Sequence, residues 1–372
     1  MDYYTLGGSG LRVSRLALGT MTFGDEWGWG ANEDLSRKLF DHYLDAGGNF
    51  FDTADLYTNG RSEEMLGKFI SDRGVRDRAV IATKFSYNAE PGNPNAGGNG
   101  RKNILRAVEG SLTRLGTDYI DLYILHTWDR VTPAEEVMRT LDDLVASGKV
   151  RHVGLSDVPA WYASRAQTVA ELRGYEPVSA LQLEYNLTER NVEDEFVDLG
   201  VRHNMGIMVW SPLASGLLSG KYRPSSDGGA GGEGRLKTVE NSGNPAFEKL
   251  TERNFAIVAE LEKVANECGR SMAQVAVNWV ANRPGVASVL VGATKVEQLA
   301  DNMQALEFEI PEELTNRLDK ASAYTPRFPY TFFGPELQGM LNGGVKIDGK
   351  PRGYHPALGV ELAAPGTEEV PS

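Results

Sequence analysis

The chain is 372 residues long, with 41% hydrophobic and 24% charged residues, which is the composition of an ordinary globular protein. Its formal net charge of −13 disfavours nucleic acid or an anionic membrane as the main partner. The single cysteine, Cys268, excludes an intrachain disulfide and a thiol metal cluster. The N-terminus does not resemble a signal peptide, and no apolar run approaches the roughly 18 residues of a membrane span. We therefore expect a cytoplasmic protein.

Short apolar runs alternate with amphipathic segments along the chain. The first two runs, 3–6 and 11–13, flank a glycine-rich turn and predict a β-hairpin. Further runs predict eight strands, at residues 16–18, 50–52, 80–84, 122–125, 150–155, 181–184, 207–210 and 289–291. Eight strands alternating with helices favour a parallel (β/α)8 TIM barrel over an open sheet. We expect the hairpin to close the bottom of this barrel.

Several helix boundaries are indicated by capping residues. The segments 132–135 (TPAE) and 271–274 (SMAQ) are capping boxes, in which a hydroxyl and a carboxylate or amide bond the first N–H groups of a helix. Gly269 is predicted to end the helix that contains Cys268.

Three segments interrupt the alternation of strands and helices. Residues 88–100 and 223–245 are rich in Gly, Pro and Asn, and we expect loops there, at the carboxyl-terminal face of the barrel where active sites of this fold lie. We assign residues 1–324 to the barrel domain. Residues 325–372 are predicted to be a tail that packs near the substrate mouth, with the aromatic segment 328–333 close to it.

Several common catalytic motifs are absent from the sequence. No G-x-G-x-x-G follows a predicted strand, so a Rossmann site has no support. The segment 344–350 (GVKIDGK) resembles a P-loop only in part, because Pro351 replaces the Ser or Thr that would hold magnesium. The histidines lack metal-ligand spacing and no G-x-S-x-G occurs, so we expect neither a metal site nor a serine hydrolase.

Four ionisable side chains fall at or just past the ends of three successive predicted strands. Asp52 closes one strand and Tyr57 follows it, while Lys84 and His126 close the next two. A charged group directly after buried strand residues is unfavourable unless it is paired. Each residue alone fits a structural role as well, but their shared position at one barrel mouth predicts a catalytic group.

The segments around these residues resemble the aldo-keto reductase family. Residues 51–57 (FDTADLY) and 60–67 (GRSEEMLG) are similar to its first signature, and residues 125–129 (LHTWD) to its histidine motif. The similarity extends from about residue 4 to residue 318. The resemblance implies a TIM-barrel oxidoreductase with a catalytic tetrad of Asp52, Tyr57, Lys84 and His126.

The resemblance also implies how the tetrad acts on an aldehyde or ketone, which needs hydride at carbon and a proton at oxygen. A phenol with an ordinary pKa near 10 is a reluctant donor. Tyr57 would act as the general acid, with the Lys84 ammonium lowering its pKa and stabilising charge on oxygen. Asp52 would keep Lys84 charged, and His126 would orient the carbonyl and share the proton relay.

Later motifs resemble the family's nicotinamide site, which is not a Rossmann fold. Residues 154–157 (GLSD) are similar to its G-x-S-N motif, but Asp157 stands where Asn is commoner and, when ionised, cannot donate a hydrogen bond. Gln182 matches a second contact to the carboxamide, and Trp210 matches an aromatic that stacks on the nicotinamide ring. Lys221 and the backbone after Trp210 match the diphosphate site, because N–H groups and an ammonium suit an anion.

Residues 290–302 (LVGATKVEQLADN) resemble the family's adenosine-phosphate motif, in a loop leading into a helix. Thr294 and Lys295, with Arg235, would hold a 2′-phosphate, so NADPH is expected in preference to NADH, and residues 223–245 would fold over it as a lid. The implied cofactor residues are Gly19, Thr20, Met21, Asp52, Ser156, Asp157, Gln182, Trp210, Ser211, Pro212, Leu213, Gly216, Lys221, Arg235, Gly292, Thr294, Lys295, Gln298 and Asn302.

The expected substrate is a small carbonyl compound. Trp27, Trp29, Tyr87 and Trp128 lie on early loops and are predicted to line its pocket, which suits aromatic aldehydes or sugar rings. The sequence contains no signal for an oligomeric state.

Two other functions are compatible with part of the sequence. One is a cofactor-binding regulatory subunit resembling potassium-channel β-subunits, which lack a histidine at the position of His126. The other is a phosphate-binding barrel isomerase or aldolase with Lys84 as a Schiff-base lysine. That function leaves Tyr57, Trp210 and the motif after the eighth strand unexplained.

Overall fold

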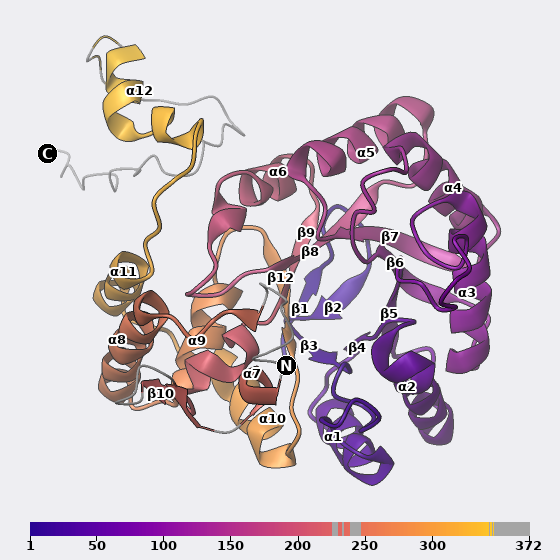
Figure 1. The fold of residues 1–372 in the computed structure, drawn as a ribbon, viewed down its shortest axis with the longest axis horizontal. Helices are drawn as coiled ribbons and strands as arrows, with labels where there is room; N and C mark the ends of the chain where they lie inside the picture. Colours follow the sequence, from indigo (N-terminus) through magenta and orange to yellow (C-terminus); the bar gives the residue numbers. More distant parts are fainter. Residues whose placement is uncertain (225–229, 233, 239–246, 342, 344, 346–372) are drawn as a thin grey trace, which may run out of the picture.

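The computed structural model describes residues 1–224, 230–232, 234–238, 247–341, 343 and 345, and it forms a closed barrel of parallel strands surrounded by helices (Figure 1). The order around the barrel is β12-β3-β4-β5-β6-β7-β8-β9. These strands are β3 (Leu16–Gly19), β4 (Phe50–Asp52), β5 (Val80–Phe85), β6 (Ile120–Leu125), β7 (Val150–Ser156), β8 (Val178–Glu184), β9 (Gly206–Trp210) and β12 (Val286–Val291). All eight predicted strands are confirmed, and all but β4 extend beyond their predicted bounds.

Helices cover the outside of the barrel and alternate with its strands. The principal ones are α1 (Glu33–Asp45), α2 (Arg61–Arg73), α3 (Arg101–Leu115), α4 (Ala134–Ala146), α5 (Ala160–Arg173), α6 (Phe196–Arg202), α8 (Glu252–Cys268), α9 (Met272–Ala281), α10 (Val296–Met303) and α11 (Glu312–Ala321). Helix α1 begins because the Asn32 side chain accepts from Leu35 N. None of the described helices has the length and apolarity that a membrane crossing requires.

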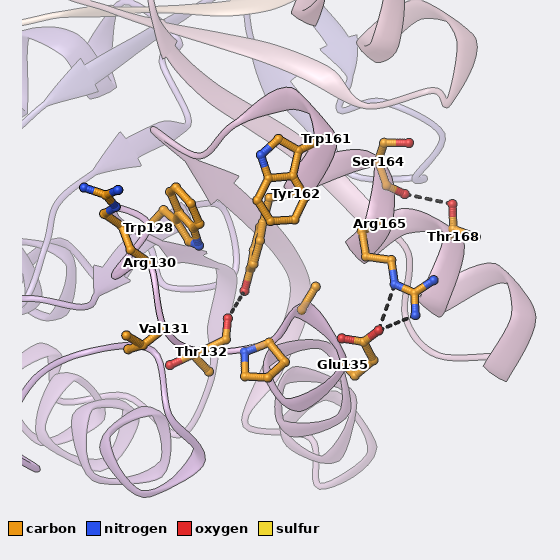
Figure 2. Close-up of a pocket in the computed structure, with 12 residues that line it drawn as sticks. Trp128, Arg130, Val131, Thr132, Glu135, Trp161, Tyr162, Ser164, Arg165 and Thr168 are labelled. Carbon is orange, nitrogen blue, oxygen red and sulfur yellow. Dashed lines mark hydrogen bonds and ion pairs between the residues drawn. The ribbon is translucent and has the colours of Figure 1, made fainter.

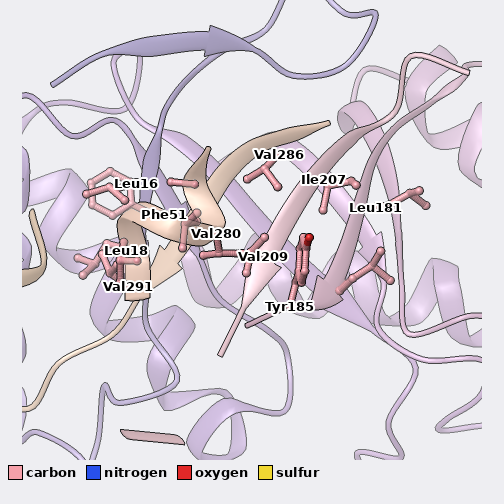
Figure 3. Packing of buried hydrophobic residues seen from close by; sticks show 14 of the residues in the cluster. Leu16, Leu18, Phe51, Leu181, Tyr185, Ile207, Val209, Val280, Val286 and Val291 are labelled. Carbon is pink, nitrogen blue, oxygen red and sulfur yellow. The ribbon is translucent and has the colours of Figure 1, made fainter. Parts of the chain in front are cut away.

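The core consists of two layers that alternate along each strand. In β3, Leu16 and Leu18 pack outward against the helices, while Ala17 points into the barrel with Leu122 and Met208. Figure 3 shows the outer layer in the wall formed by β3, β8, β9 and β12. Because side chains fill the barrel interior, the polar residues gather above it, at the carboxyl ends of the strands.

The N-terminal hairpin closes the other end of the barrel, as predicted. Strands β1 (Tyr3–Thr5) and β2 (Arg12–Ser14) pair in antiparallel fashion, and Leu6 and Val13 are buried with the interior residues. Gly7 has a φ of +57°, and a Cβ there would lie 2.3 Å from the carbonyl oxygen of Asn204. Only glycine therefore fits this turn.

The helix boundaries confirm two of the three predictions made from capping residues. Ser271 forms the predicted capping box with Gln274 at the start of α9, and Gly269 ends α8 with a φ of +62°. The capping box predicted at residues 132–135 is wrong. Helix α4 has Pro133 at its N-cap with no side-chain bond, because the Thr132 hydroxyl instead donates to Asp129 Oδ2 at 2.6 Å.

The predicted loops are partly described. Residues 88–100, all of them described, contain no helix or strand, as expected. Within 223–245 the described elements are β10 (Arg223–Pro224), β11 (Ala230–Gly231) and α7 (Arg235–Thr238), and residues 225–229, 233 and 239–245 of the predicted lid lie outside the described part.

The described part of the tail extends away from the barrel. Its helix α12 (Pro335–Leu341) is separated from the barrel by an extended segment (Figure 1), and Phe328 and Phe332 are exposed. Residues 346–372 lie outside the described part, so packing of the tail near the substrate mouth stays a prediction.

Candidate active site

A cavity of about 1310 Å³ opens at the carboxyl ends of the barrel strands. It is larger than the roughly 300–1,000 Å³ of most small-molecule pockets, which suits a long ligand together with a second, smaller one. Gly19, Asp52, Gln182 and Trp210 line it from the ends of β3, β4, β8 and β9, and Gly292 lines it just after β12.

Three of the four predicted catalytic residues meet at the Lys84 ammonium. Lys84 Nζ lies 2.6 Å from Asp52 Oδ1, 2.7 Å from Thr53 O and 3.2 Å from Tyr57 Oη. Lys84 and Asp52 are 0% and 1% exposed, so their ion pair is withdrawn from water. Tyr57 is 9% exposed and lines the cavity. The phenol is therefore the member of this group that is most exposed to a ligand in the cavity.

The surroundings of Lys84 favour its charged form. Burial alone would lower the pKa of Lys84, but the Asp52 carboxylate and the Tyr57 hydroxyl outweigh burial and raise it. The second Asp52 oxygen, Oδ2, accepts from Gln182 Nε2 at 2.6 Å. Asp52 is thus bonded on both oxygens and fixed beneath the cavity.

A strained turn aims Tyr57 at Lys84. Thr58, Asn59 and Gly60 all have positive φ angles, of +46°, +55° and +91°, a conformation that is unfavourable for Thr and Asn. The Thr58 hydroxyl donates to Phe23 O at 2.9 Å, which holds the turn. The chain can therefore leave β4, place the Tyr57 ring against Lys84 and enter α2 within a few residues.

His126 lies beside Tyr57 and stays neutral. The two rings meet edge to face, with centroids 5.9 Å apart. Burial, together with the nearby Lys84 ammonium, holds the pKa of His126 well below its ordinary value. A neutral imidazole presents one N–H donor, the group needed to orient a carbonyl oxygen.

Two further residues position His126, and the sequence did not single them out. Ser86 Oγ accepts from His126 N at 3.1 Å and donates to Asn99 Oδ1 at 2.7 Å. Asn99 Nδ2 in turn donates to Thr127 O at 2.9 Å. The glycine-rich loop that contains Asn99 thus helps to hold His126, and the backbone of Ser86 is strained, with a positive φ of +136°.

The predicted carboxamide contacts lie together on the cavity wall. Ser156, Asp157 and Gln182 all line the cavity. Ser156 Oγ is buried and has no hydrogen-bond partner among the described residues. Because buried polar atoms are nearly always bonded, this hydroxyl fits a hydrogen bond to a ligand. Trp210 stands beside them, with its Nε1 donating to Asp157 Oδ1 at 3.2 Å.

The loop after Trp210 forms a cradle suited to an anion. Ser211, Ser215 and Gly216 have positive φ angles and line the cavity. The Lys221 side chain lies over Gly216, where a Cβ would approach its Cε to 2.5 Å. Backbone N–H groups in such turns, with an ammonium above them, suit a diphosphate.

The segment between β12 and α10 lines the far end of the cavity. Gly292, Thr294, Gln298 and Asn302 all face it, and Thr294 N donates to Gln298 Oε1 at 3.3 Å. The residues present therefore fit an extended dinucleotide, from the orphaned Ser156 hydroxyl at one end to this loop at the other.

Of the other predicted cofactor residues, Met21, Pro212 and Leu213 line the cavity, and two lie away from it. Thr20 is fully buried, with its hydroxyl donating to Asp52 O at 3.0 Å. Lys295 is exposed next to Thr294 and outside the cavity lining. The side chain of Arg235 lies outside the described residues. Contacts of these three with a cofactor stay predictions.

Aromatic side chains surround the mouth above His126. Trp27 and Trp29 pack with ring centroids 5.6 Å apart, and Tyr87 meets His126 edge to face at 5.0 Å. All three line the cavity. They form an apolar wall next to the place where a carbonyl oxygen would meet Tyr57.

Trp128 is separate from this wall. It lies in a second pocket of about 580 Å³ at the start of α4 and α5 (Figure 2). Its ring meets Trp161 edge to face at 5.5 Å and lies 6.0 Å from Tyr162. Trp128 is not among the residues that line the large cavity, so a substrate contact by Trp128 stays a prediction.

Comparisons with known proteins agree with this geometry. The sequence profile described as the aldo/keto reductase family matches residues 15–323. The chain belongs to the aldo/keto reductase family. Its relatives include a probable voltage-gated potassium channel subunit beta of Oryza sativa subsp. japonica, 38% identical over 88% of this chain and 98% of the relative. Another is an aryl-alcohol dehydrogenase [NADP(+)] of Phanerodontia chrysosporium, 36% identical over 88% and 87%.

A third relative, versiconal hemiacetal acetate reductase of Aspergillus parasiticus, is 34% identical over 84% of this chain and 95% of the relative. Two of these three relatives are named as dehydrogenase or reductase. Family and relatives together indicate an oxidoreductase on a TIM barrel.

Proposed function

We propose that this chain transfers a hydride from NADPH to an aldehyde or ketone, reversibly, with Tyr57 as the general acid. The observation that supports this most directly is the buried Lys84 ammonium, held between Asp52 and the phenol of Tyr57. The large cavity with its anion cradle, described above, supports a dinucleotide cofactor. NADPH is favoured over NADH because Thr294 and Lys295 would meet a 2′-phosphate.

The residues of the chain have separable roles in this reaction. When bound, the cofactor supplies the hydride. Tyr57 Oη donates its proton to the carbonyl oxygen, and the Lys84 ammonium 3.2 Å away stabilises the phenolate that remains. Asp52 keeps Lys84 charged, and neutral His126 donates a hydrogen bond that orients the carbonyl oxygen.

The cofactor would be held along the length of the cavity. Ser156 and Asp157 would bond the carboxamide, and Trp210 would stack on the nicotinamide ring. Gln182 Nε2 is engaged by Asp52, so its Oε1 would accept from the carboxamide N–H. The backbone around Gly216, with Lys221, would hold the diphosphate.

A Tyr57→Phe substitution tests the proposal. Turnover of an aromatic aldehyde such as benzaldehyde should fall at least about 100-fold, the ordinary minimum contribution of a general acid, while NADPH still quenches tryptophan fluorescence. The matched control is Tyr123→Phe, because Tyr123 is a buried tyrosine on β6 whose hydroxyl makes only a 3.5 Å bond to Ile104 O. Tyr57→Phe with unchanged turnover would show that the proton comes from another group.

A second candidate is a cofactor-binding regulatory subunit with little turnover, which the similarity to the potassium-channel relative supports. A single-turnover experiment separates the two. Absorbance of bound NADPH at 340 nm should decay when benzaldehyde or another aldehyde from a panel is added. Tight NADPH binding without decay for any aldehyde or ketone would favour the regulatory subunit.

A further inference from the structure

Asp157 is held rigidly at the nicotinamide end of the cavity. It follows directly after β7 with a φ of +46°, a left-handed conformation that is rare for aspartate outside turns. Its carbonyl oxygen accepts from Trp128 N at 3.3 Å, and its Oδ1 accepts from Trp210 Nε1 at 3.2 Å. It is exposed, and the surface that it exposes lines the cavity. A carboxylate thus borders the place where Trp210 would stack on the cofactor ring.

Few other charges act on this carboxylate. Lys84 on β5 is a cation that acts on it, and that ammonium is already paired with a buried carboxylate on β4. Glu184 on β8 is a second anion, but Lys249 Nζ lies 2.8 Å from its Oε1. Tyr87 faces Asp157 from the loop after β5 as a neutral phenol. Asp157 therefore has no ion pair of its own among the described residues.

We propose that Asp157 makes the site discriminate between the oxidation states of its cofactor, binding NADP⁺ more tightly relative to NADPH than an asparagine would. The inference rests on the proposed function. The two nucleotides differ in charge only at the nicotinamide ring, which is cationic when oxidised and neutral when reduced. A carboxylate next to that ring attracts the cation and leaves the neutral ring unaffected. Asparagine has nearly the same shape without the charge.

The discrimination depends on pH because Asp157 must be ionised. Although Asp157 is exposed along its cavity edge, the protein walls packed around the carboxylate raise its pKa to about 6, and hydrogen bonding, chiefly from Trp210, offsets this only in part. Below pH 6 the side chain is neutral and the two nucleotides meet the same uncharged wall. Above pH 6 the anion forms and favours NADP⁺. The ratio Kd(NADPH)/Kd(NADP⁺) should therefore rise with pH.

The test is to measure both dissociation constants by isothermal titration calorimetry from pH 5 to pH 8. For the wild type we expect the ratio to rise about tenfold, which corresponds to one unit of difference in the Asp157 pKa between the two complexes. In Asp157→Asn the ratio should stay flat. The 2′-phosphate also titrates near pH 6, but both nucleotides contain it and its effect cancels in the ratio.

Glu189→Gln is the matched control, because Glu189 lines the same cavity but bonds Asn191 with its Oε1. It should reproduce the tenfold rise. A flat ratio in the wild type, or the same rise in Asp157→Asn, would overturn the inference while leaving the proposed function intact. Failure of both nucleotides to bind the wild type would instead overturn the proposed function, and the inference with it. The wild-type profile decides the question even if Asp157→Asn folds poorly.

Discussion

Replacing Lys84 with methionine tests whether the buried ion pair stabilises the barrel as well as the reaction. Methionine keeps most of the volume of the side chain and removes its charge. The Asp52 carboxylate, 1% exposed, would then retain only the hydrogen bond from Gln182 Nε2. An uncompensated carboxylate in such a place typically costs about 3–5 kcal/mol of stability.

The structure also predicts how this loss is recovered. In the double variant Asp52→Asn/Lys84→Met, the buried charges are both gone and an amide faces Gln182. The free energy of unfolding should therefore be higher than in Lys84→Met alone, although two residues have changed. We expect a coupling of about 2–3 kcal/mol between the two substitutions, in the upper part of the range for residues in direct contact. The double variant stays inactive, because no ammonium faces Tyr57.

The coupling is measured in a double-mutant cycle, by urea unfolding of the four proteins at pH 7 followed by far-UV circular dichroism. Wild type, both single variants and the double variant give the coupling as a difference of differences, which removes effects that each substitution has alone. If the two single losses simply add to within about 0.5 kcal/mol, Lys84 and Asp52 do not stabilise one another and the reasoning from their 2.6 Å contact fails.

The remaining predictions concern a buried carboxyl and the anion cradle. Burial and repulsion from Glu63 raise the pKa of Asp55 from 3.8 to about 7, so the stability that this group provides at low pH is lost as the pH rises through 7. Asp55→Asn should therefore gain about 2–3 kcal/mol relative to wild type between pH 5 and pH 8, measured by urea unfolding at both values. Gly216→Ala should weaken NADPH binding roughly tenfold or more, as measured by calorimetry. The added Cβ would displace the Lys221 side chain, which would then lose its charge-assisted contact to the diphosphate.

The predictions for Asp55→Asn and Gly216→Ala can each be contradicted by one measurement. Equal stability differences for Asp55→Asn at the two pH values would mean that Asp55 titrates normally. For Gly216→Ala, the control is Gly334→Ala, where a Cβ meets nothing within 4 Å. Unchanged NADPH affinity in Gly216→Ala would remove Lys221 from the proposed diphosphate site.

The fold was largely predictable because barrel strands are continuous apolar runs. Every barrel strand was found from its buried residues, and the errors in these strands were confined to their ends, where polar residues such as Ser156 still pair with the neighbouring strand. The short strands β10 and β11 fall in a segment that the sequence predicted to be a loop. The mistaken capping box shows the limit of local motifs. Thr132 has the right neighbours for a cap, but its hydroxyl is taken by Asp129, a bond that depends on the shape of the loop.

The sequence predicted the site residues that lie at strand ends. It did not predict the contacts that depend on how a loop folds back onto the barrel. Tyr57 could be placed near Lys84 because Tyr57 follows β4 and Lys84 lies near the end of the adjacent strand β5. The support that Ser86 and Asn99 give to His126 was missed, since it depends on how a loop of 13 residues, 88–100, returns to the barrel. The separation of Trp128 from the other mouth aromatics was missed for a related reason. The edge-on contact of Trp128 with Trp161 joins the loop after β6 to the first turn of α5.

The pairing of β12 with β3 has a consequence for how the protein matures during synthesis. Residues 289–291 pair with residues 16–18, and a Cβ on Gly292 would lie 3.6 Å from Gly19 O, so one wall of the cavity joins the first and last strands of the barrel. Chains still on the ribosome lack the last strand and cannot complete this wall. Capture of the proposed cofactor would therefore report that the barrel has closed, and a ligand that binds only the closed form stabilises that form by mass action.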